Sequence, residues 1–257
     1  MSKAPAKTEA TPLLGFEKVT FGYDPAKPIL ADFTWQVNQG EVWALLGPSG
    51  SGKTTLLHLA AGLRRPAVGR IVLDGQPVTK PRQDVGLMLQ SYGLLPWYSA
   101  ARNVQVGLRI RGLDKQKAAR RGHEWLQRLE LAEVADQFPG QLSGGQRQRV
   151  ALARVVALES RLLLLDEPLS AVDELGRERL QKRLFEMSRQ TGATTLMVTH
   201  SVEEAALLAD HILLITDHAP IRRYDVLTPP VKATFPRRDD PAFVQFCQTV
   251  RTKVGLA

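Results

Sequence analysis

The sequence predicts an α/β fold with a mostly parallel sheet, a small antiparallel β part and an inserted helical subdomain. Short runs rich in Val, Ile and Leu alternate with longer stretches of helical period, and parallel strands need helical crossovers. Helical spacing then dominates from about residue 91 to residue 160, between two sections of the sheet. With 257 residues, of which 44% are hydrophobic, the chain can form one such domain with a large core.

The elements follow in order along the chain. Residues 1–14 have no apolar stretch of the length that a signal peptide requires, so we expect a disordered tail there. Residues 15–217 then form the main domain, with early strands of the antiparallel part at 15–21 and 33–37. Residues 218–257 are rich in Pro, and we expect a tail with at most a short helix around 243–250. Apolar runs indicate buried strands of the main sheet at 42–46, 162–165, 195–199 and 212–215.

Composition excludes several classes of protein. The apolar runs are far shorter than the roughly 20 residues that cross a bilayer, so the chain is not expected to span a membrane by itself. A single cysteine, Cys247, cannot form an internal disulfide, and there is no Cys/His cluster that predicts a zinc site. The net charge of +8 comes from scattered basic pairs. We interpret these as a solvated basic surface and expect no nucleic-acid partner.

A glycine-rich segment follows the strand at 42–46 and precedes a run that favours helix at 55–61. It reads Gly-Pro-Ser-Gly-Ser-Gly-Lys-Thr and matches the pattern G-x-x-x-x-G-K-[ST] of a phosphate-binding loop. Its glycines let backbone N–H groups curl around a phosphate, and the helix dipole favours the same anion. Lys53 would reach the β- and γ-phosphates, and Thr54 would bind Mg²⁺. The expected nucleotide contacts are Gly47, Pro48, Ser49, Gly50, Ser51, Gly52, Lys53, Thr54 and Thr55.

Two carboxylates end the buried run at 162–165. Asp166 would hold the magnesium, and Glu167 would polarise the water that attacks the γ-phosphate. Taken alone, an Asp-Glu pair after an apolar strand is more often a helix cap or a solvated turn. Because open α/β sheets bind ligands at the carboxyl edge of their strands, the phosphate-binding loop upstream favours the catalytic interpretation.

Residues 142–146 read Leu-Ser-Gly-Gly-Gln. Ser143, Gly144, Gly145 and Gln146 would begin a helix running to about residue 158, whose N-terminus is a second site for phosphate, although such a start can also be a plain cap. With this segment the chain resembles the ATP-binding-cassette (ABC) transporter ATPases. The resemblance implies a P-loop NTPase core of the RecA-like type, ATP hydrolysis, and a head-to-tail pair of subunits with ATP between the loop of one and the signature of the other.

The resemblance extends to four further positions in the family's order. Tyr23 resembles the aromatic residue that stacks on adenine, and Gln90 resembles the glutamine that touches Mg²⁺ and senses the permease. Residues 170–173 resemble the loop that communicates across the dimer, and His200 resembles the switch histidine near the γ-phosphate. Three of them have a plainer alternative: Tyr23 as a strand-end core residue, Asp173 as a helix cap and His200 as a structural histidine. The resemblance implies that Glu167, His200 and Lys53 are catalytic, with Thr54, Gln90 and Asp166 around Mg²⁺.

Residues 94–97, 103–104 and 201–205 resemble the ATPase subunits of bacterial importers for nitrate, sulfonate, taurine and related solutes. This implies an integral membrane permease, a periplasmic or extracellular solute-binding protein, and a peripheral place on the cytoplasmic side of the membrane. An exporter or a lipid- or lipoprotein-release motor stays open, as does a soluble ABC ATPase outside transport. Nothing in the chain is expected to select the solute.

Overall fold

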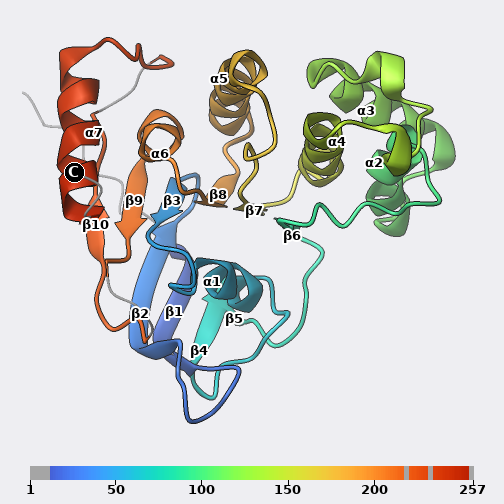
Figure 1. Ribbon diagram of the computed structural model, residues 1–257. Coiled ribbons are helices and arrows are strands. Elements are labelled where there is room, and N and C mark those ends of the chain that lie inside the picture. The colour runs from blue at the N-terminus through green and yellow to red at the C-terminus, as the bar shows by residue number, and fades with distance from the viewer. Residues whose placement is uncertain (1–11, 217–219, 231–233, 255–257) are drawn as a thin grey trace, which may run out of the picture.

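The computed structural model describes residues 12–216, 220–230 and 234–254. A six-stranded sheet with the order β10-β9-β3-β8-β7-β6 runs through its centre (Figure 1). Neighbouring strands are parallel except at the edge, where β10 pairs antiparallel with β9. The α/β fold predicted from the sequence is therefore confirmed. The strands are β3 (Val42–Leu46), β6 (Val85–Met88), β7 (Leu162–Asp166), β8 (Thr194–Val198), β9 (His211–Leu214) and β10 (Asp225–Leu227).

The central strands are mostly apolar because both faces of the sheet are covered. In β7, Leu163 and Leu165 face one hydrophobic core, and Leu162 and Leu164 face the other. Successive side chains of a strand point to opposite faces, so a strand between two cores needs an unbroken apolar run. At the carboxyl edge of the sheet, β7 ends in Asp166 and is followed by Glu167, and β8 is followed by Thr199.

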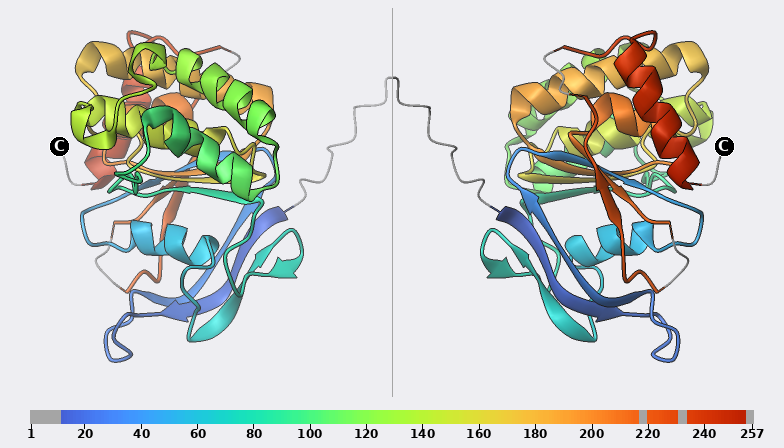
Figure 2. Two further views of the ribbon diagram at one scale, coloured as in Figure 1. Left: turned by 90° about the vertical axis from the view of Figure 1, so that its right-hand side faces the viewer. Right: turned by 90° about the vertical axis from the view of Figure 1, so that its left-hand side faces the viewer.

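One face of the sheet is covered by α1 (Lys53–Ala60) and a four-stranded antiparallel sheet with the order β2-β1-β4-β5 (Figure 2). Its strands are β1 (Pro12–Phe21), β2 (Leu30–Asn38), β4 (Val68–Leu73) and β5 (Gln76–Pro77). The strand β1 begins inside the range expected to be a tail, because Leu13 and Leu14 are buried in this core. Residues 1–11 of that expected tail lie outside the described residues.

The helical lobe lies between β6 and β7, which are neighbours in the sheet, and it forms the right-hand part of Figure 1. On α3, Trp125, Leu126 and the following Leu129 are buried, as their helical spacing predicts. The lobe contains α2 (Ala100–Ile110), α3 (Lys115–Arg128), the short 3₁₀ helices η1 (Ala132–Val134) and η2 (Pro139–Gln141), and α4 (Gly144–Val156).

The remaining helices are α5 (Glu174–Thr191), α6 (Val202–Leu208) and α7 (Pro241–Val254). The expectation of at most a short helix around 243–250 is wrong, since α7 has 14 residues. Pro241 stands at its first position, where its missing N–H costs nothing, and Asp240 accepts a hydrogen bond from Ala242 N at 2.8 Å. Phe243 and Cys247 are buried in the same core as α6. The helix α7 thus packs on the main body.

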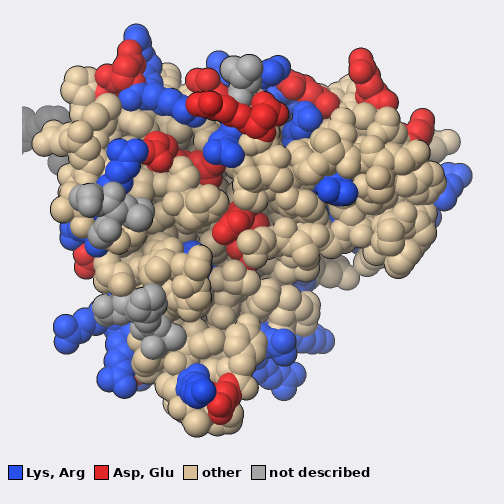
Figure 3. Space-filling model, in the orientation of Figure 1, with Lys and Arg blue, Asp and Glu red and all other residues tan. Residues whose placement is uncertain are grey.

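Among the described residues, no helix has both the length and the apolar character needed to cross a bilayer. Figure 3 shows acidic and basic side chains interspersed along the rim over α5 and its neighbours. Several of these charges form ion pairs, among them Arg183 with Glu130 and Arg189 with Asp210. On this face the charge does not form a field of one sign.

Candidate nucleotide site

In the loop between β3 and α1, two positions can be occupied only by glycine. Gly52 has a φ of 96°, and a Cβ there would lie 2.6 Å from Ile29 Cγ2. A Cβ on Gly47 would lie 2.5 Å from the carbonyl oxygen of Ile215. Both distances are shorter than any real Cβ contact, so a side chain at either point would force the loop out of its curve. The curve leads directly into the N-terminus of α1, where unpaired N–H groups attract an anion.

Lys53 lies across this loop. Its Nζ donates hydrogen bonds to the carbonyl oxygens of Gly47 at 2.9 Å and Pro48 at 2.7 Å. Burial lowers the pKa of Lys53, while the charges of Glu167 and Asp166 oppose that shift. The structure thus places a cation over a concave backbone, next to two carboxylates. That arrangement suits a ligand that carries several negative charges.

Asp166 is the last residue of β7 and is only 3% exposed. Its Oδ2 accepts a hydrogen bond from Thr54 Oγ1 at 2.9 Å, whereas its Oδ1 is buried and has no hydrogen-bond partner. Burial raises the pKa of Asp166, and the nearby charge of Glu167 raises it further, against the hydrogen bond from Thr54. An unsatisfied buried carboxylate oxygen beside a hydroxyl is the donor set that Mg²⁺ prefers.

Glu167 lies where three strand ends meet. Its Oε2 accepts a hydrogen bond from Gln90 Nε2 at 3.2 Å, just beyond β6. Its Oε1 lies 3.6 Å from Nδ1 of His200, just beyond β8. The backbone of Glu167 is left-handed, with a φ of 50°, and its N–H donates to the carbonyl oxygen of Val198 at 3.0 Å. A non-glycine residue in this region is strained, and such strain is common at functional sites.

A buried network beneath His200 was not predicted from the sequence. Thr199 Oγ1 donates to Glu204 Oε2 at 2.7 Å, and Ser201 N donates to Thr199 Oγ1 at 3.1 Å. Glu204 is 6% exposed, and Arg177 Nε lies 3.9 Å from its Oε1. Arg177 also donates to the carbonyl oxygen of Val172 at 3.0 Å. Thr199, Ser201 and Glu204 stand close to His200 in the sequence and could have indicated this network. Arg177 stands far from them in the sequence and could not be identified in this way.

The second predicted half-site begins α4. Ser143 Oγ accepts from Gln146 N at 3.2 Å, and Gln146 Oε1 accepts from Ser143 N at 2.8 Å, which is a capping box. Gly144 and Gly145 line an open pocket together with residues 171–173. None of the residues that line this pocket belongs to the phosphate-binding loop. The structure therefore brings Lys53, Thr54, Gln90, Asp166, Glu167 and His200 together, and it places residues 143–145 in a separate pocket.

Tyr23 lies outside the hydrogen-bonded cluster and is 56% exposed. Its ring packs edge-to-face on Phe21, with centroids 5.2 Å apart, and the guanidinium of Arg64 lies 5.4 Å from its centroid. A flat, exposed aromatic ring can stack on a base. No pattern in the sequence indicates that Arg64 lies beside the ring of Tyr23.

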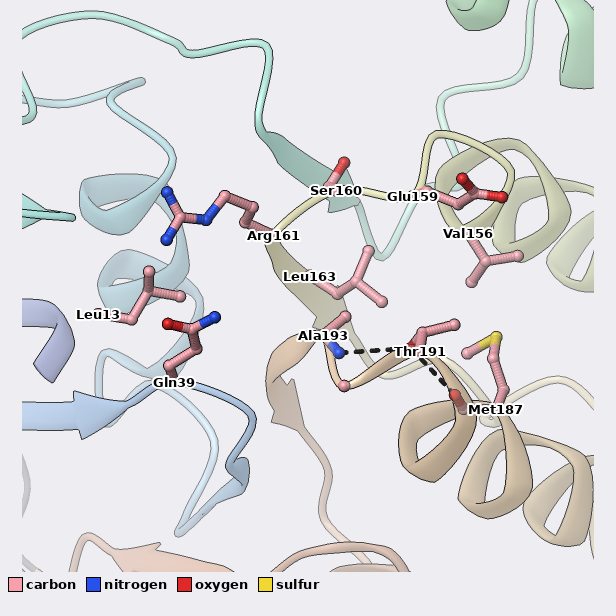
Figure 4. Close-up of a pocket in the computed structure, with 11 residues that line it drawn as sticks. Leu13, Gln39, Val156, Glu159, Ser160, Arg161, Leu163, Met187, Thr191 and Ala193 are labelled. Carbon is pink, nitrogen blue, oxygen red and sulfur yellow. Dashed lines mark hydrogen bonds between the residues drawn. The ribbon is translucent and has the colours of Figure 1, made fainter. Parts of the chain in front are cut away.

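A cavity of about 340 Å³ lies at the opposite edge of the sheet, around the start of β7 and the end of α5 (Figure 4). Its charged residues are already paired, Glu159 with Arg121 and Arg161 with Asp74. Thr191 Oγ1 donates to the carbonyl oxygen of Met187 at 3.0 Å. The cavity has neither a phosphate-binding loop nor paired carboxylates, and the chemistry lies at the carboxyl edge.

Comparison with known proteins identifies the family of the chain. Residues 30–170 match the family model described as ABC transporter. A taurine import ATP-binding protein, TauB, from Yersinia pestis bv. Antiqua (strain Antiqua) is 45% identical over 190 residues, or 74% of each chain. The TauB protein of Pseudomonas aeruginosa (strain ATCC 15692 / PAO1) is 45% identical over 196 residues, covering 76% of this chain and 74% of its own.

Among solved structures, a dimeric post-hydrolysis state of the ATP-binding cassette MJ0796 bound to ADP and Pi aligns with a TM-score of 0.75 and 27% identity. The alignment covers 83% of this chain and 98% of that one. The match confirms the P-loop NTPase fold and supports ATP binding and a pair of like subunits. The loop, the carboxylates and these relatives agree, and the chain belongs to the ABC transporter family as one of its ATP-hydrolysing subunits.

Proposed function

We propose that this ATPase powers the import of a small solute of the taurine, sulfonate or nitrate class through a separate membrane permease. The observation that carries the proposal is the pairing of one complete catalytic cluster with a signature segment in a separate pocket. The relatives named for taurine import support the direction of transport and the class of solute. An exporter or a soluble ABC ATPase has no such support among them.

The glycine curve and Lys53 bind the β- and γ-phosphates of ATP. In this proposal Lys53 exchanges the two loop carbonyls for phosphate oxygens, which are stronger acceptors because they are charged. Thr54, Asp166 and Gln90 would hold Mg²⁺, which would neutralise charge on the transferred phosphoryl group. The orphaned Oδ1 of Asp166 and the hydroxyl of Thr54 fit such an ion. Tyr23 stacks on the adenine.

Glu167 orients the attacking water. The water oxygen attacks the γ-phosphorus, the bond to the bridging oxygen of ADP breaks, and Glu167 accepts a hydrogen bond from the water. Gln90 and His200 hold the Glu167 carboxylate from two sides, at 3.2 Å and 3.6 Å. In this proposal His200 also binds the γ-phosphate of ATP. The chemistry rests on positioning and electrostatics.

A second copy of the chain supplies Ser143, Gly144 and Gly145 to the γ-phosphate. The N-terminus of α4 offers backbone N–H groups and a positive dipole end for this purpose. Only the γ-phosphate bridges the two half-sites, so its loss on hydrolysis removes the affinity that holds the pair closed. Closing and opening of the pair drives the change of access in the permease.

The permease docks beside Gln90 on the loop that carries Trp97. Trp97 is 65% exposed, and in this proposal its ring is an apolar contact for the permease. The buried Asn103 holds this loop in shape, accepting from Leu95 N at 2.8 Å and donating to the carbonyl oxygen of Tyr98 at 2.9 Å. The subunit thus lies on the cytoplasmic side of the membrane as a peripheral protein, and a periplasmic or extracellular solute-binding protein delivers the cargo.

Copurification from the native membrane tests this proposal. Tagged protein is solubilised in detergent, captured, and its partners are identified by mass spectrometry, with Trp97→Ala as a docking variant. We expect a permease with several membrane spans in the wild-type sample and much less of it with Trp97→Ala. Recovery of only soluble or nucleic-acid partners would contradict the transport function.

A further inference from the structure

Gln148 is a fully buried amide on α4, and its hydrogen bonds leave the helix. It has 0% exposure. Its Nε2 donates to the carbonyl oxygen of Glu167 at 2.8 Å and to Ser170 Oγ at 3.1 Å, and its Oε1 accepts from Ala171 N at 3.0 Å. Three hydrogen bonds from one side chain thus span the whole turn that follows β7.

These bonds fix the backbone of Glu167 from its carbonyl side. Its N–H is already held by Val198, and its φ of 50° is unfavourable for a residue with a side chain. A strained conformation persists only where the surroundings hold it. The direction of the Glu167 carboxylate therefore depends on Gln148, although Gln148 itself touches neither the carboxylate nor the phosphate-binding loop through these bonds.

The first turn of α4 packs on the same segment. A Cβ on Gly145 would lie 3.2 Å from the carbonyl oxygen of Ala171, and one on Gly144 would lie 3.8 Å from Ala171 Cβ. Gln148 stands only about one helical turn beyond these glycines. Packing and hydrogen bonds therefore connect the signature segment, Gln148 and the turn that carries Glu167 within a single chain.

We propose that Gln148 is a positioning residue that couples the two ATP sites of the paired ATPase. The inference rests on the proposed head-to-tail pair, in which a chain's signature touches its partner's ATP while its Glu167 acts on its own. When α4 is drawn toward the partner's γ-phosphate, Gln148 carries that displacement to the turn after β7 and so to Glu167. Each site becomes fully active only when the other holds ATP.

The test measures cooperativity, which a purely structural role would not change. Steady-state hydrolysis of Mg-ATP by the isolated full chain is followed against ATP concentration for wild type and for Gln148→Met, which keeps the volume and removes all three hydrogen bonds. Gln148→Glu is the second variant, since it is nearly isosteric and faces the Glu167 carbonyl with an acceptor. Gln181→Glu is the matched control, because Gln181 is also buried, at 2% exposure, but bonds to Arg238 on the far side of α5.

We expect a Hill coefficient near 2 for wild type and for Gln181→Glu, and near 1 for both Gln148 variants. Because the carboxylate loses its fixed position, kcat should fall about 10- to 100-fold, while ATP binding to the isolated subunit should change by less than about twofold. A Gln148 variant with a lower kcat and an unchanged Hill coefficient would overturn the coupling and leave the proposed function intact. A wild-type chain that forms no ATP-dependent pair would overturn both.

Discussion

The two half-sites of this ATPase differ in how many of their contacts a single chain provides. Around the phosphate-binding loop, Lys53 bonds to the loop, Thr54 bonds to Asp166, and Glu167 accepts a hydrogen bond from Gln90. At the signature, Ser143 is exposed, and its side chain bonds within its own capping box. A half-site that is buried and internally bonded needs only ATP, whereas an exposed one needs a second chain. Changes in the two regions should therefore affect different steps.

The largest effect should come from Lys53→Ala. The change removes the cation that faces the phosphates, so we expect kcat/KM for ATP to fall about 10³-fold, with loss of ATP binding as well as turnover. Titration with a fluorescent ATP analogue and a phosphate-release assay measure the two effects. Lys80→Ala, at an exposed lysine, should leave both unchanged. Full ATP affinity in Lys53→Ala would mean that the complete half-site binds nucleotide in another way.

Glu167→Gln separates binding from chemistry within the same half-site. The amide keeps the size of the side chain but orients water poorly, so kcat should fall about 10²- to 10³-fold with ATP affinity within about twofold. Single-turnover hydrolysis and equilibrium ATP binding are the measurements. The exposed Glu186→Gln is the control for loss of a carboxylate. Hydrolysis close to wild type would exclude Glu167 as the residue that orients water.

Ser143→Ala should slow hydrolysis about tenfold without weakening ATP binding to a single subunit, because Ser143 acts on the partner's nucleotide. It also removes a helix cap, which costs about 1 kcal/mol of stability. Ser99→Ala provides the matched control, since Ser99 caps α2 by accepting from Arg102 N at 3.3 Å. Both variants should lose similar thermal stability, and only Ser143→Ala should lose activity. Equal losses of activity would show that capping alone explains the effect.

A smaller effect is expected from Glu204→Gln beneath His200. The amide weakens the hydrogen bond from Thr199 and leaves Arg177 without its carboxylate, so the histidine loses its fixed position. We expect kcat to fall about three- to tenfold with an unchanged KM for ATP. Glu186→Gln, at an exposed carboxylate of α5, should have no effect on either constant. A change in KM alone would contradict a role in positioning His200.

Asp166→Asn should slow hydrolysis and yet stabilise the nucleotide-free protein. Burial raises the pKa of Asp166, so the folded state binds its proton more tightly than the unfolded state does. Stability is then lost as the pH rises from the ordinary carboxyl pKa through the raised one, and it stays lower above that range. At neutral pH we expect Tm to rise by a few degrees, since each kcal/mol shifts Tm by about 2–4 °C in a chain of this size.

Thermal unfolding at pH 7 and at pH 3, without nucleotide or metal, measures the Asp166→Asn effect. The gain should disappear at pH 3, where the carboxyl group is protonated in both states. A gain of equal size at both pH values would show that its cause is not the buried charge.

Much of this comparison could be predicted from the sequence, for a physical reason. Parallel strands between two cores leave unbroken apolar runs, and their carboxyl ends meet at one edge, so Gln90, Asp166, Glu167 and His200 could be expected together. The chemical roles of these residues stay predictions until they are measured. The phosphate-binding loop could also be predicted, because its glycine pattern is visible in the sequence. In the structure, two of these glycines have no room for a Cβ.

The supporting contacts could not be predicted, because they join residues far apart along the chain. Gln148 bonds to Glu167 and Ala171, and Arg177 reaches both Val172 and Glu204. No local pattern specifies such pairs. The same holds for β10, whose few residues form a strand only because β9 offers a free edge.

The mass of Glu167→Gln in solution tests the central claim most directly. Size exclusion with light scattering would compare samples holding Mg²⁺ with ATP or with ADP, with Ser143→Ala added in a parallel variant. We predict a mass of 28.4 kDa with Mg²⁺ and ADP, and the mass of two chains with Mg²⁺ and ATP. The added Ser143→Ala change should weaken this pairing. A single-chain mass with ATP, or a pair that forms equally with ADP and without Ser143, would contradict the account.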